Sequence, residues 1–277
     1  MQIRRIVVAI DASPTSEAAL EATVDLAAAW GAELLGIFVE DVNLLRMASL
    51  PFARELGSHS GEFRSVDPEN LRRQLRWQAE RARKGLESAA LSRGVTVSFK
   101  VARGRVNEEL LAALSEADLL SLGKGGKTLA ARLGLGSTAR AIASGASGRV
   151  LLLSHVSRVV GPVAVVYDDS ASGERALASA RELARGLDTG LTALCLAQTR
   201  EGAQDLATRI RETAEGSESV RCRHCTVSDI SDLAKIARSM GANAMVVPAG
   251  GAILRDQMVE SIVKSFSGPV LIVADRS

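Results

Sequence analysis

Short, fully apolar runs bounded by turn residues alternate along the chain with segments whose apolar residues recur at helical spacing. The first run, residues 6–10, is followed by Ser13 and Pro14, which are typical of a helix N-cap and of the first helical position. Apolar residues at helical spacing continue to Trp30, and Gly31 favours the end of the helix. Strands that alternate with helices in this way indicate parallel βαβ units and a doubly wound α/β sheet.

The same pattern predicts five strands in the first part of the chain: residues 6–10, 34–39, 95–101, 118–122 and 150–153. Helices are predicted between them, including 107–114 and 137–144. Residues 40–66 form an irregular insertion, after which Asp67 and Pro68 begin a long helix that runs to about residue 92. One side of this helix is basic, which favours a solvated face. The alternative is that the insertion covers a ligand site or contacts a partner, because long loops in compact domains tend to be functional.

The pattern starts again near residue 163, which indicates two copies of one domain. Asp168 follows the strand at 163–167 as Asp11 follows the first strand, 157 positions earlier. Gly268 repeats Gly148 at a distance of only 120 positions, so the second copy is shorter by about 37 residues. We therefore predict two domains, residues 1–155 with the insertion at about 40–67, and residues 161–277.

Composition narrows the range of functions. The chain has 277 residues, of which 47% are apolar and only 3% aromatic, and its formal net charge is +2. So small a charge and so few aromatic side chains argue against a nucleic-acid-binding surface. Three cysteines and no apolar stretch of about 20 residues favour a cytoplasmic protein without disulfides or a membrane span.

The segment from Asp118 to Thr138 combines a strand, a glycine-rich loop and the start of a helix, an arrangement typical of anion sites. Two nucleotide motifs fit this segment poorly. A Walker loop is incomplete, because Ser121 stands at the position of its first glycine although Gly126 and Lys127 match its end. The dinucleotide fingerprint matches residues 134–139, but the preceding residues do not form a convincing strand.

A third spacing, G-x(2)-G-x(9)-G-[ST], is matched without gaps by Gly123, Gly126, Gly136 and Ser137. With Asp11 after the first strand and a second strand that ends in Val39, the whole chain resembles the universal stress protein family in a tandem form. In that family the glycine motif marks the members that bind ATP. The resemblance implies two Rossmann-like α/β domains, each a five-stranded parallel sheet in the order 3-2-1-4-5 flanked by helices.

The resemblance also implies an adenine-nucleotide site in the first domain, at the carboxyl ends of the strands, where ligands of open parallel sheets lie. The candidate binding residues are Asp11, Val39, Gly123, Gly126, Lys127, Gly136, Ser137 and Thr138. ATP is the expected ligand, with AMP and ADP as alternatives and with or without Mg²⁺. We predict no catalytic residue and no metal site made of protein side chains.

Each candidate has an expected role. By family likeness, Asp11 would make polar contacts with the adenosine end, and Val39 would contact it through its backbone. Glycine has no Cβ, so the three glycines of the motif would let the backbone approach the ribose and the phosphates. Ser137 and Thr138 begin the next helix and could reach phosphate oxygens, while Lys124 and Lys127 would add mobile positive charge.

The second copy departs from the motif, and we expect it to be structural. Pro248, which has no N–H, stands in its loop, and Asp256 stands where the first copy has Gly136. A carboxylate at that place would repel phosphate. Two alternatives from other classes stay open for the whole chain. One is a nucleotide-free interaction protein whose glycine loop only shapes turns, with Asp11 capping a helix, and the other is a slow ATP-hydrolysing switch.

Residues 150–153 and 270–273 are short apolar strands that fall at sheet edges if the strand order follows the family. Exposed apolar edges invite pairing. In the family that the chain resembles, equivalent edges pair across a dimer axis, which implies that the two copies pair within one chain as a pseudo-dimer. A larger homo-oligomer and a protein partner in a stress response are further expectations.

The run Cys222-Arg223-His224-Cys225 looks like a redox or zinc motif but falls on a predicted strand. Side chains alternate between the two faces of a strand, so Cys222 and Cys225 are expected on opposite sides. One metal ion or one disulfide could not easily join them.

Overall fold

A computed structural model describes residues 3–11, 13–50, 52, 54–56, 63–65, 67–125, 138–139, 147–154, 158–212, 220–251 and 253–274. The helices of this part of the chain are α1 (Pro14–Trp30), α2 (Val42–Ala48), α3 (Pro68–Leu91), α4 (Val106–Ser115), α7 (Ala171–Gly186), α8 (Arg200–Glu212), α9 (Leu233–Ser239) and α10 (Asp256–Ser265), with the 3₁₀ helix η1 (Val227–Asp232). No helix among these is long and apolar enough to cross a membrane.

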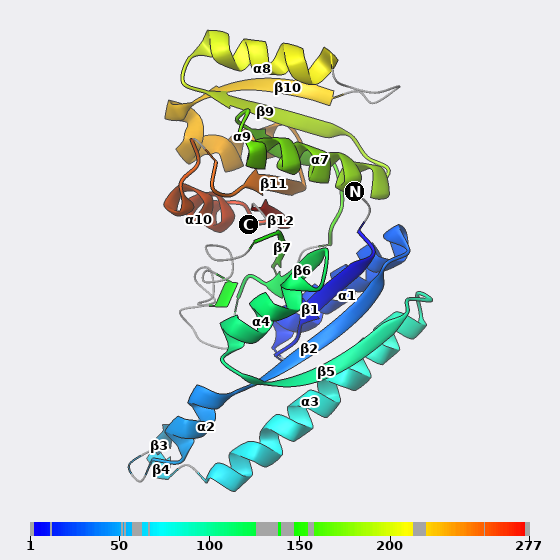
Figure 1. Ribbon diagram of the computed structural model, residues 1–277, viewed down its shortest axis with the longest axis vertical. Coiled ribbons are helices and arrows are strands. Elements are labelled where there is room, and N and C mark those ends of the chain that lie inside the picture. The colour runs from blue at the N-terminus through cyan, green and yellow to red at the C-terminus, as the bar shows by residue number, and fades with distance from the viewer. Residues whose placement is uncertain are drawn as a thin grey trace.

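One large sheet runs through the described residues. Its strands are β1 (Arg5–Ala9), β2 (Glu33–Asp41), β5 (Val97–Gly104), β6 (Leu119–Gly123), β7 (Arg149–Leu153), β8 (Val163–Tyr167), β9 (Leu191–Ala197), β10 (Val220–Thr226), β11 (Ala244–Pro248) and β12 (Val270–Val273). Their order is β10-β9-β8-β11-β12-β7-β6-β1-β2-β5, so β10 and β5 form the two edges. Figure 1 shows these edges at opposite ends of the molecule, covered by α8 and α3 respectively.

The sheet consists of two equivalent halves. Strands β1, β2, β5, β6 and β7 form the first half in the order β5-β2-β1-β6-β7, and strands β8 to β12 form the second in the order β10-β9-β8-β11-β12. All neighbours within each half are parallel. Each half therefore has the order 3-2-1-4-5, and the predicted fold class of two Rossmann-like α/β units is confirmed.

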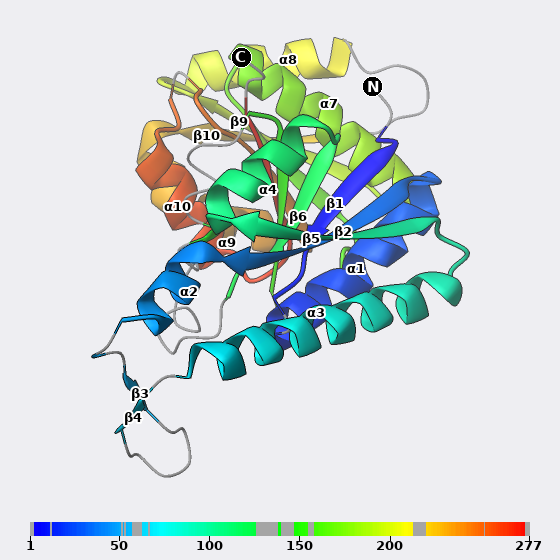
Figure 2. The same cartoon turned by 60° about the horizontal axis from the view of Figure 1, so that its bottom comes forward.

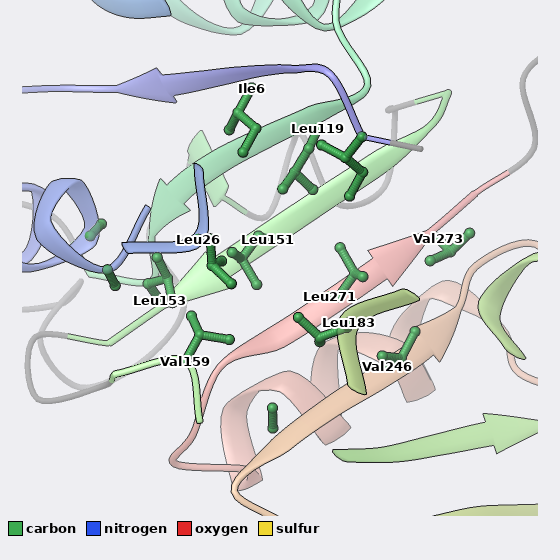
Figure 3. Packing of buried hydrophobic residues seen from close by; sticks show 14 of the residues in the cluster. Ile6, Leu26, Leu119, Leu151, Leu153, Val159, Leu183, Val246, Leu271 and Val273 are labelled. Carbon is green, nitrogen blue, oxygen red and sulfur yellow. The ribbon is translucent and has the colours of Figure 1, made fainter. Parts of the chain in front are cut away.

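The two halves join through an antiparallel pair of strands, β7 and β12, in which Leu152 lies opposite Val270 and Leu151 opposite Leu271. The pairing between the two short apolar strands that the sequence predicts is therefore present within the chain. Figure 3 shows buried side chains of both halves on one side of this join, among them Leu151, Leu153, Leu271 and Val273. The pairing covers edges that would otherwise expose unpaired backbone groups.

Helices cover both faces of the sheet. Helices α1, α3, α7 and α8 supply buried side chains to one apolar cluster, which contains Ile6, Val8 and Val165. Helix α4, η1, α9 and α10 pack on the other cluster, which contains the alternate strand residues Val7, Leu120 and Val166. Most strand residues are apolar on both faces because helices lie on both sides, which explains why the runs in the sequence are continuous and not alternating.

The start and the end of α1 follow the sequence prediction closely. The Ser13 side chain accepts a hydrogen bond from the backbone N–H of Ser16 at 3.2 Å, and Pro14 occupies the first turn. Gly31 adopts a left-handed conformation (φ 63°) and closes the C-terminus. This N-cap places the N-terminus of α1 directly after the carboxyl end of β1.

The sequence pattern predicts an irregular insertion at residues 40–66, but the structure shows regular elements there. Strand β2 extends to Asp41, which caps the short helix α2 by accepting the N–H of Asn43 at 2.9 Å. The antiparallel strands β3 (Arg54–Leu56) and β4 (Phe63–Ser65) follow before α3 begins after Asp67. Figure 2 shows that α2 and the β3–β4 pair project beyond the body of the sheet. The prediction failed because short helices and hairpins have too few residues for a clear period.

Candidate functional site

Three of the candidate residues lie at the same edge of the first half. Asp11 follows β1, Val39 lies near the carboxyl end of β2, and Gly123 is the last residue of β6. These strands are neighbours in the sheet, with β1 between β2 and β6. Beyond the end of β1 the chain remains attached to β2, because the N–H of Ile10 donates to the carbonyl of Ile37 at 2.9 Å. The topology therefore brings these three residues together, as the sequence predicts for the switch point of an open sheet.

Asp11 is exposed and stabilises the turn between β1 and α1. Its Oδ1 accepts the backbone N–H of Ser13 at 3.0 Å, and its own N–H donates to Ser16 Oγ at 3.1 Å. Ser13, not Asp11, is the N-cap of α1. Since one carboxylate oxygen stabilises the turn and the side chain faces solvent, Asp11 is held in place with acceptor capacity left for a ligand's hydroxyl or amino group.

Gly123 has a packing reason to be glycine. A Cβ at this position would lie 2.9 Å from Thr15 Cγ2 and 3.3 Å from the carbonyl carbon and oxygen of Thr15. The first turn of α1 thus lies against the end of β6, and any side chain here would push it away. The missing Cβ makes room for Thr15 and not, as the sequence analysis predicts, for a ribose.

The remaining candidates divide into two groups. Gly126, Lys127, Gly136 and Ser137 lie outside the described residues. Thr138 is described, with helical backbone and a partly exposed side chain. Its helical backbone lies within the helix predicted at residues 137–144. Val39 is half-buried and pairs with Ala102 of β5 through its backbone.

Lys124 does not supply mobile charge, which corrects the expectation from the sequence. Its side chain is only 9% exposed, and its Nζ donates to the carbonyl oxygens of Phe266 at 2.8 Å and Gly268 at 2.6 Å. Both acceptors belong to the second half. Burial lowers the pKa of Lys124 to about 8, so the amine is still mostly protonated at neutral pH. Lys124 lies between Gly123 and Gly125 in a glycine-rich segment, and nothing in that local sequence indicates its burial.

The matching edge of the second half is closed by its own loop. Asp168, the counterpart of Asp11, is only 7% exposed, and its Oδ1 accepts the hydroxyl of Ser170 at 2.5 Å. Its Oδ2 is buried without a hydrogen-bond partner in the described part of the chain. A Cβ on Gly251 would lie 2.6 Å from that oxygen. The loop after β11 therefore lies directly on the Asp168 carboxylate, whereas the equivalent carboxylate of Asp11 in the first half is exposed.

A polar group that the sequence analysis missed lies beside Asp168. Asp169, whose φ is 60°, forms an ion pair with Arg209 of α8 at 2.5 Å. The Tyr167 hydroxyl donates to Glu174 of α7, and burial with these nearby carboxylates raises the pKa of Tyr167 well above its usual value. These contacts tie the end of β8 to two helices. Tyr167 is the only tyrosine in the chain and stands at the end of an apolar run, which is the one feature of the sequence that could have drawn attention to this group.

The cysteines lie as the strand pattern predicts. Cys222 packs against the cluster on one face of the sheet and Cys225 lies in the cluster on the other, and all three cysteines are free. Cys195 of β9 shares the face of Cys222. Within the described residues, no group of three or more His, Cys, Asp or Glu side chains could hold a metal ion.

Cys222 is expected to be the most reactive thiol of the native protein. Interaction with the Cys195 thiol, with the charge of Arg211 nearby, lowers the pKa of Cys222 to about 7. Burial raises the pKa of Cys225 to about 11. The interaction with Cys222, together with burial, raises the pKa of Cys195 well above its usual value. Since the thiolate is the nucleophile, alkylation of Cys222 by iodoacetamide should rise with pH to half its maximum near pH 7. Mass spectrometry of the labelled peptides measures it. Equal labelling of all three cysteines, or a midpoint at the ordinary thiol value, would refute the assignment.

The fold is that of an α/β protein in which Asp11, Val39 and Gly123 meet at the carboxyl ends of neighbouring parallel strands in the first half. The universal stress protein family model matches residues 2–154, more than half of the 277-residue chain, so the chain belongs to the universal stress protein family. The matched residues span the first half of the sheet. No curated protein matches the sequence.

Solved structures agree with this fold. A universal stress protein from Archaeoglobus fulgidus is similar over 100% of both chains, with a TM-score of 0.79 and 15% identity. A functionally unknown protein from Pseudomonas aeruginosa is similar over 99% of this chain and 93% of its own, with a TM-score of 0.60 and 14% identity. At such low identities these similarities concern the fold alone. They show that the arrangement of both halves recurs in other proteins.

Proposed function

We propose that this universal stress protein binds ATP in its first half and acts in a stress or signalling response without a dedicated catalytic residue. The observation that carries the proposal is the place where the glycine motif begins. Its first residue, Gly123, ends β6 at the ligand edge of the sheet, beside Asp11 with its exposed carboxylate. The gapless spacing to Gly126, Gly136 and Ser137 then supplies glycines and a helix start suited to phosphates.

In this proposal the adenosine end lies over Asp11 and Val39, and the phosphates lie along the residues Gly126, Lys127, Gly136, Ser137 and Thr138. Asp11 would accept a hydrogen bond from a hydroxyl or amino group of the ligand, because its turn uses Oδ1. The site belongs to the open edge of one half. AMP and ADP share the adenosine end and would bind with fewer phosphate contacts.

We further propose that residues 1–155 form the nucleotide-binding domain and residues 161–277 a structural copy of it. The covered carboxylate of Asp168 supports this division of roles, since the loop with Gly251 leaves no approach to Oδ2. Pro248 cannot donate an N–H to a phosphate, and Asp256 would repel one. One chain is therefore expected to bind one nucleotide.

Calorimetry of two variants tests the site. Gly126→Asp would place a negative charge and extra bulk against the phosphates, and ATP affinity is expected to fall at least about tenfold, or about 1.4 kcal/mol. The matched control is Asp256→Gly, which removes the equivalent charge from the second half and is expected to leave binding unchanged. A stoichiometry near two per chain, or unchanged binding by Gly126→Asp, would overturn the asymmetric site.

Release of nucleotide on denaturation separates this function from the nucleotide-free alternative. The purified protein would be denatured, and the supernatant analysed by chromatography and absorbance for adenine nucleotides. A protein that carries none and gives no calorimetric signal with ATP would be an interaction protein whose glycine loop only shapes the chain. Phosphate release above a protein-free control would identify a slow ATPase.

A further inference from the structure

The connection between α10 and β12 in the second half is held by side chains of the first half. Three consecutive carbonyl oxygens, those of Phe266, Ser267 and Gly268, accept hydrogen bonds across the join. Lys124 Nζ donates to the first and the third, and Ser154 Oγ donates to the second at 3.0 Å. Lys124 Nζ also lies 3.4 Å from the carbonyl oxygen of Val263 in the last turns of α10.

The chemistry of a helix end explains why an ammonium group fits here. The last carbonyl groups of a helix have no intrahelical donor, and the helix dipole makes that end negative. Lys124 is 9% exposed, so its charge is tolerated only because the carbonyl oxygens replace water. Without the lysine, the carbonyl oxygen of the buried residue Phe266 would lose this donor, which is unfavourable.

The position equivalent to Lys124 in the second half does not carry a lysine. The backbone N–H of Lys124 donates to Leu153 at 2.6 Å, and in the second half the N–H of Ala249 donates to Val273 at 2.8 Å. Ala249 thus occupies the position of Lys124 in the second half, but it has no side-chain donor. Lys124 therefore ties the start of the first half's loop to the second half, whereas Ala249 cannot tie the second half's loop to the first half in this way.

Lys124 directly follows Gly123, the first glycine of the motif, and precedes Gly126 by two residues. We propose that Lys124 is a positioning residue through which the second half holds the start of the nucleotide loop, so that ATP binding in the first half and the order of the α10–β12 connection are coupled. This inference rests on the proposed function. Because such coupling is reciprocal, whatever loosens residues 266–268 weakens ATP binding, and bound ATP stabilises those residues.

Lys124→Met tests the coupling, with Lys235→Met as the matched control, since Lys235 is an exposed lysine of α9 that pairs with Asp232. Calorimetry should show ATP binding weakened about tenfold in Lys124→Met and unchanged in the control. Hydrogen exchange followed by mass spectrometry is the second measurement. In the wild type, ATP should slow exchange of the peptide that contains residues 266–268, and in Lys124→Met this effect of ATP should be lost.

A purely structural lysine would not give the second result, because ATP would then leave exchange at residues 266–268 unchanged in the wild type. That outcome overturns the inference, as does unaltered ATP affinity in a folded Lys124→Met. If Lys124→Met does not fold, Ser154→Ala carries the same test with a smaller effect of about threefold. A wild type that binds no ATP refutes the proposed function and the inference together, whereas the other outcomes leave the proposed function standing.

Discussion

Replacement of Phe266 by alanine is expected to lower the free energy of unfolding by about 3–5 kcal/mol, the usual cost of removing a buried aromatic ring. Phe266 is 2% exposed and lies in the apolar cluster that α4, α9 and α10 share. It is also the C-cap residue of α10, and its carbonyl oxygen accepts the Lys124 ammonium. The ring is among the largest fully buried side chains of the described residues, so its removal would leave a large cavity in the cluster. Urea unfolding measured by circular dichroism tests the expectation.

Phe52→Ala is the matched control. Phe52 is 78% exposed, beside the projecting helix α2, and its removal is expected to change the free energy of unfolding by no more than about 0.5 kcal/mol. If the free energy of unfolding of Phe266→Ala fell by less than about 1 kcal/mol relative to this control, the burial of the Phe266 ring would be contradicted.

Leu152→Asp is expected to prevent stable folding. Leu152 is 0% exposed in the middle of β7, between β6 and β12, so a carboxylate there would be buried without a charged partner. The variant loses the leucine side chain and gains a buried carboxylate. We expect its free energy of unfolding to fall by more than about 4 kcal/mol, which is a large part of the stability of an ordinary domain. Soluble yield, circular dichroism and the unfolding midpoint measure the effect.

Val101→Asp is the corresponding control on an edge strand. Val101 lies on β5, where its side chain is 49% exposed, and the new carboxylate would stay in contact with water. We expect the stability to fall by about 1 kcal/mol or less. If Leu152→Asp folded as well as Val101→Asp, the join between β7 and β12 could not be the buried interface described above.

Much of the fold could be predicted from local patterns. The apolar strand runs, the capping pair Ser13 and Pro14, and the stop at Gly31 depend on residues close together in sequence, so periodicity and capping chemistry suffice to locate them. The repeat of Asp11 at Asp168 similarly indicated two copies of one unit. The insertion was predicted less well, because α2 and the β3–β4 pair are too short to show a period.

Parts of the candidate site depended on residues far apart in the chain. The sequence by itself determined the glycine spacing after Gly123, the strand that ends at Gly123, and the position of Asp11 and Val39 at strand ends. Only the tertiary structure decided that Thr15 lies against Gly123, that Gly251 covers Asp168, and that Lys124 binds the end of α10. Each of these contacts joins elements that the sheet brings together by its strand order. A lysine in a polar loop has the same local pattern whether its ammonium faces solvent or the carbonyl groups of a helix about 140 residues away, because the partner that decides its role is supplied by packing alone.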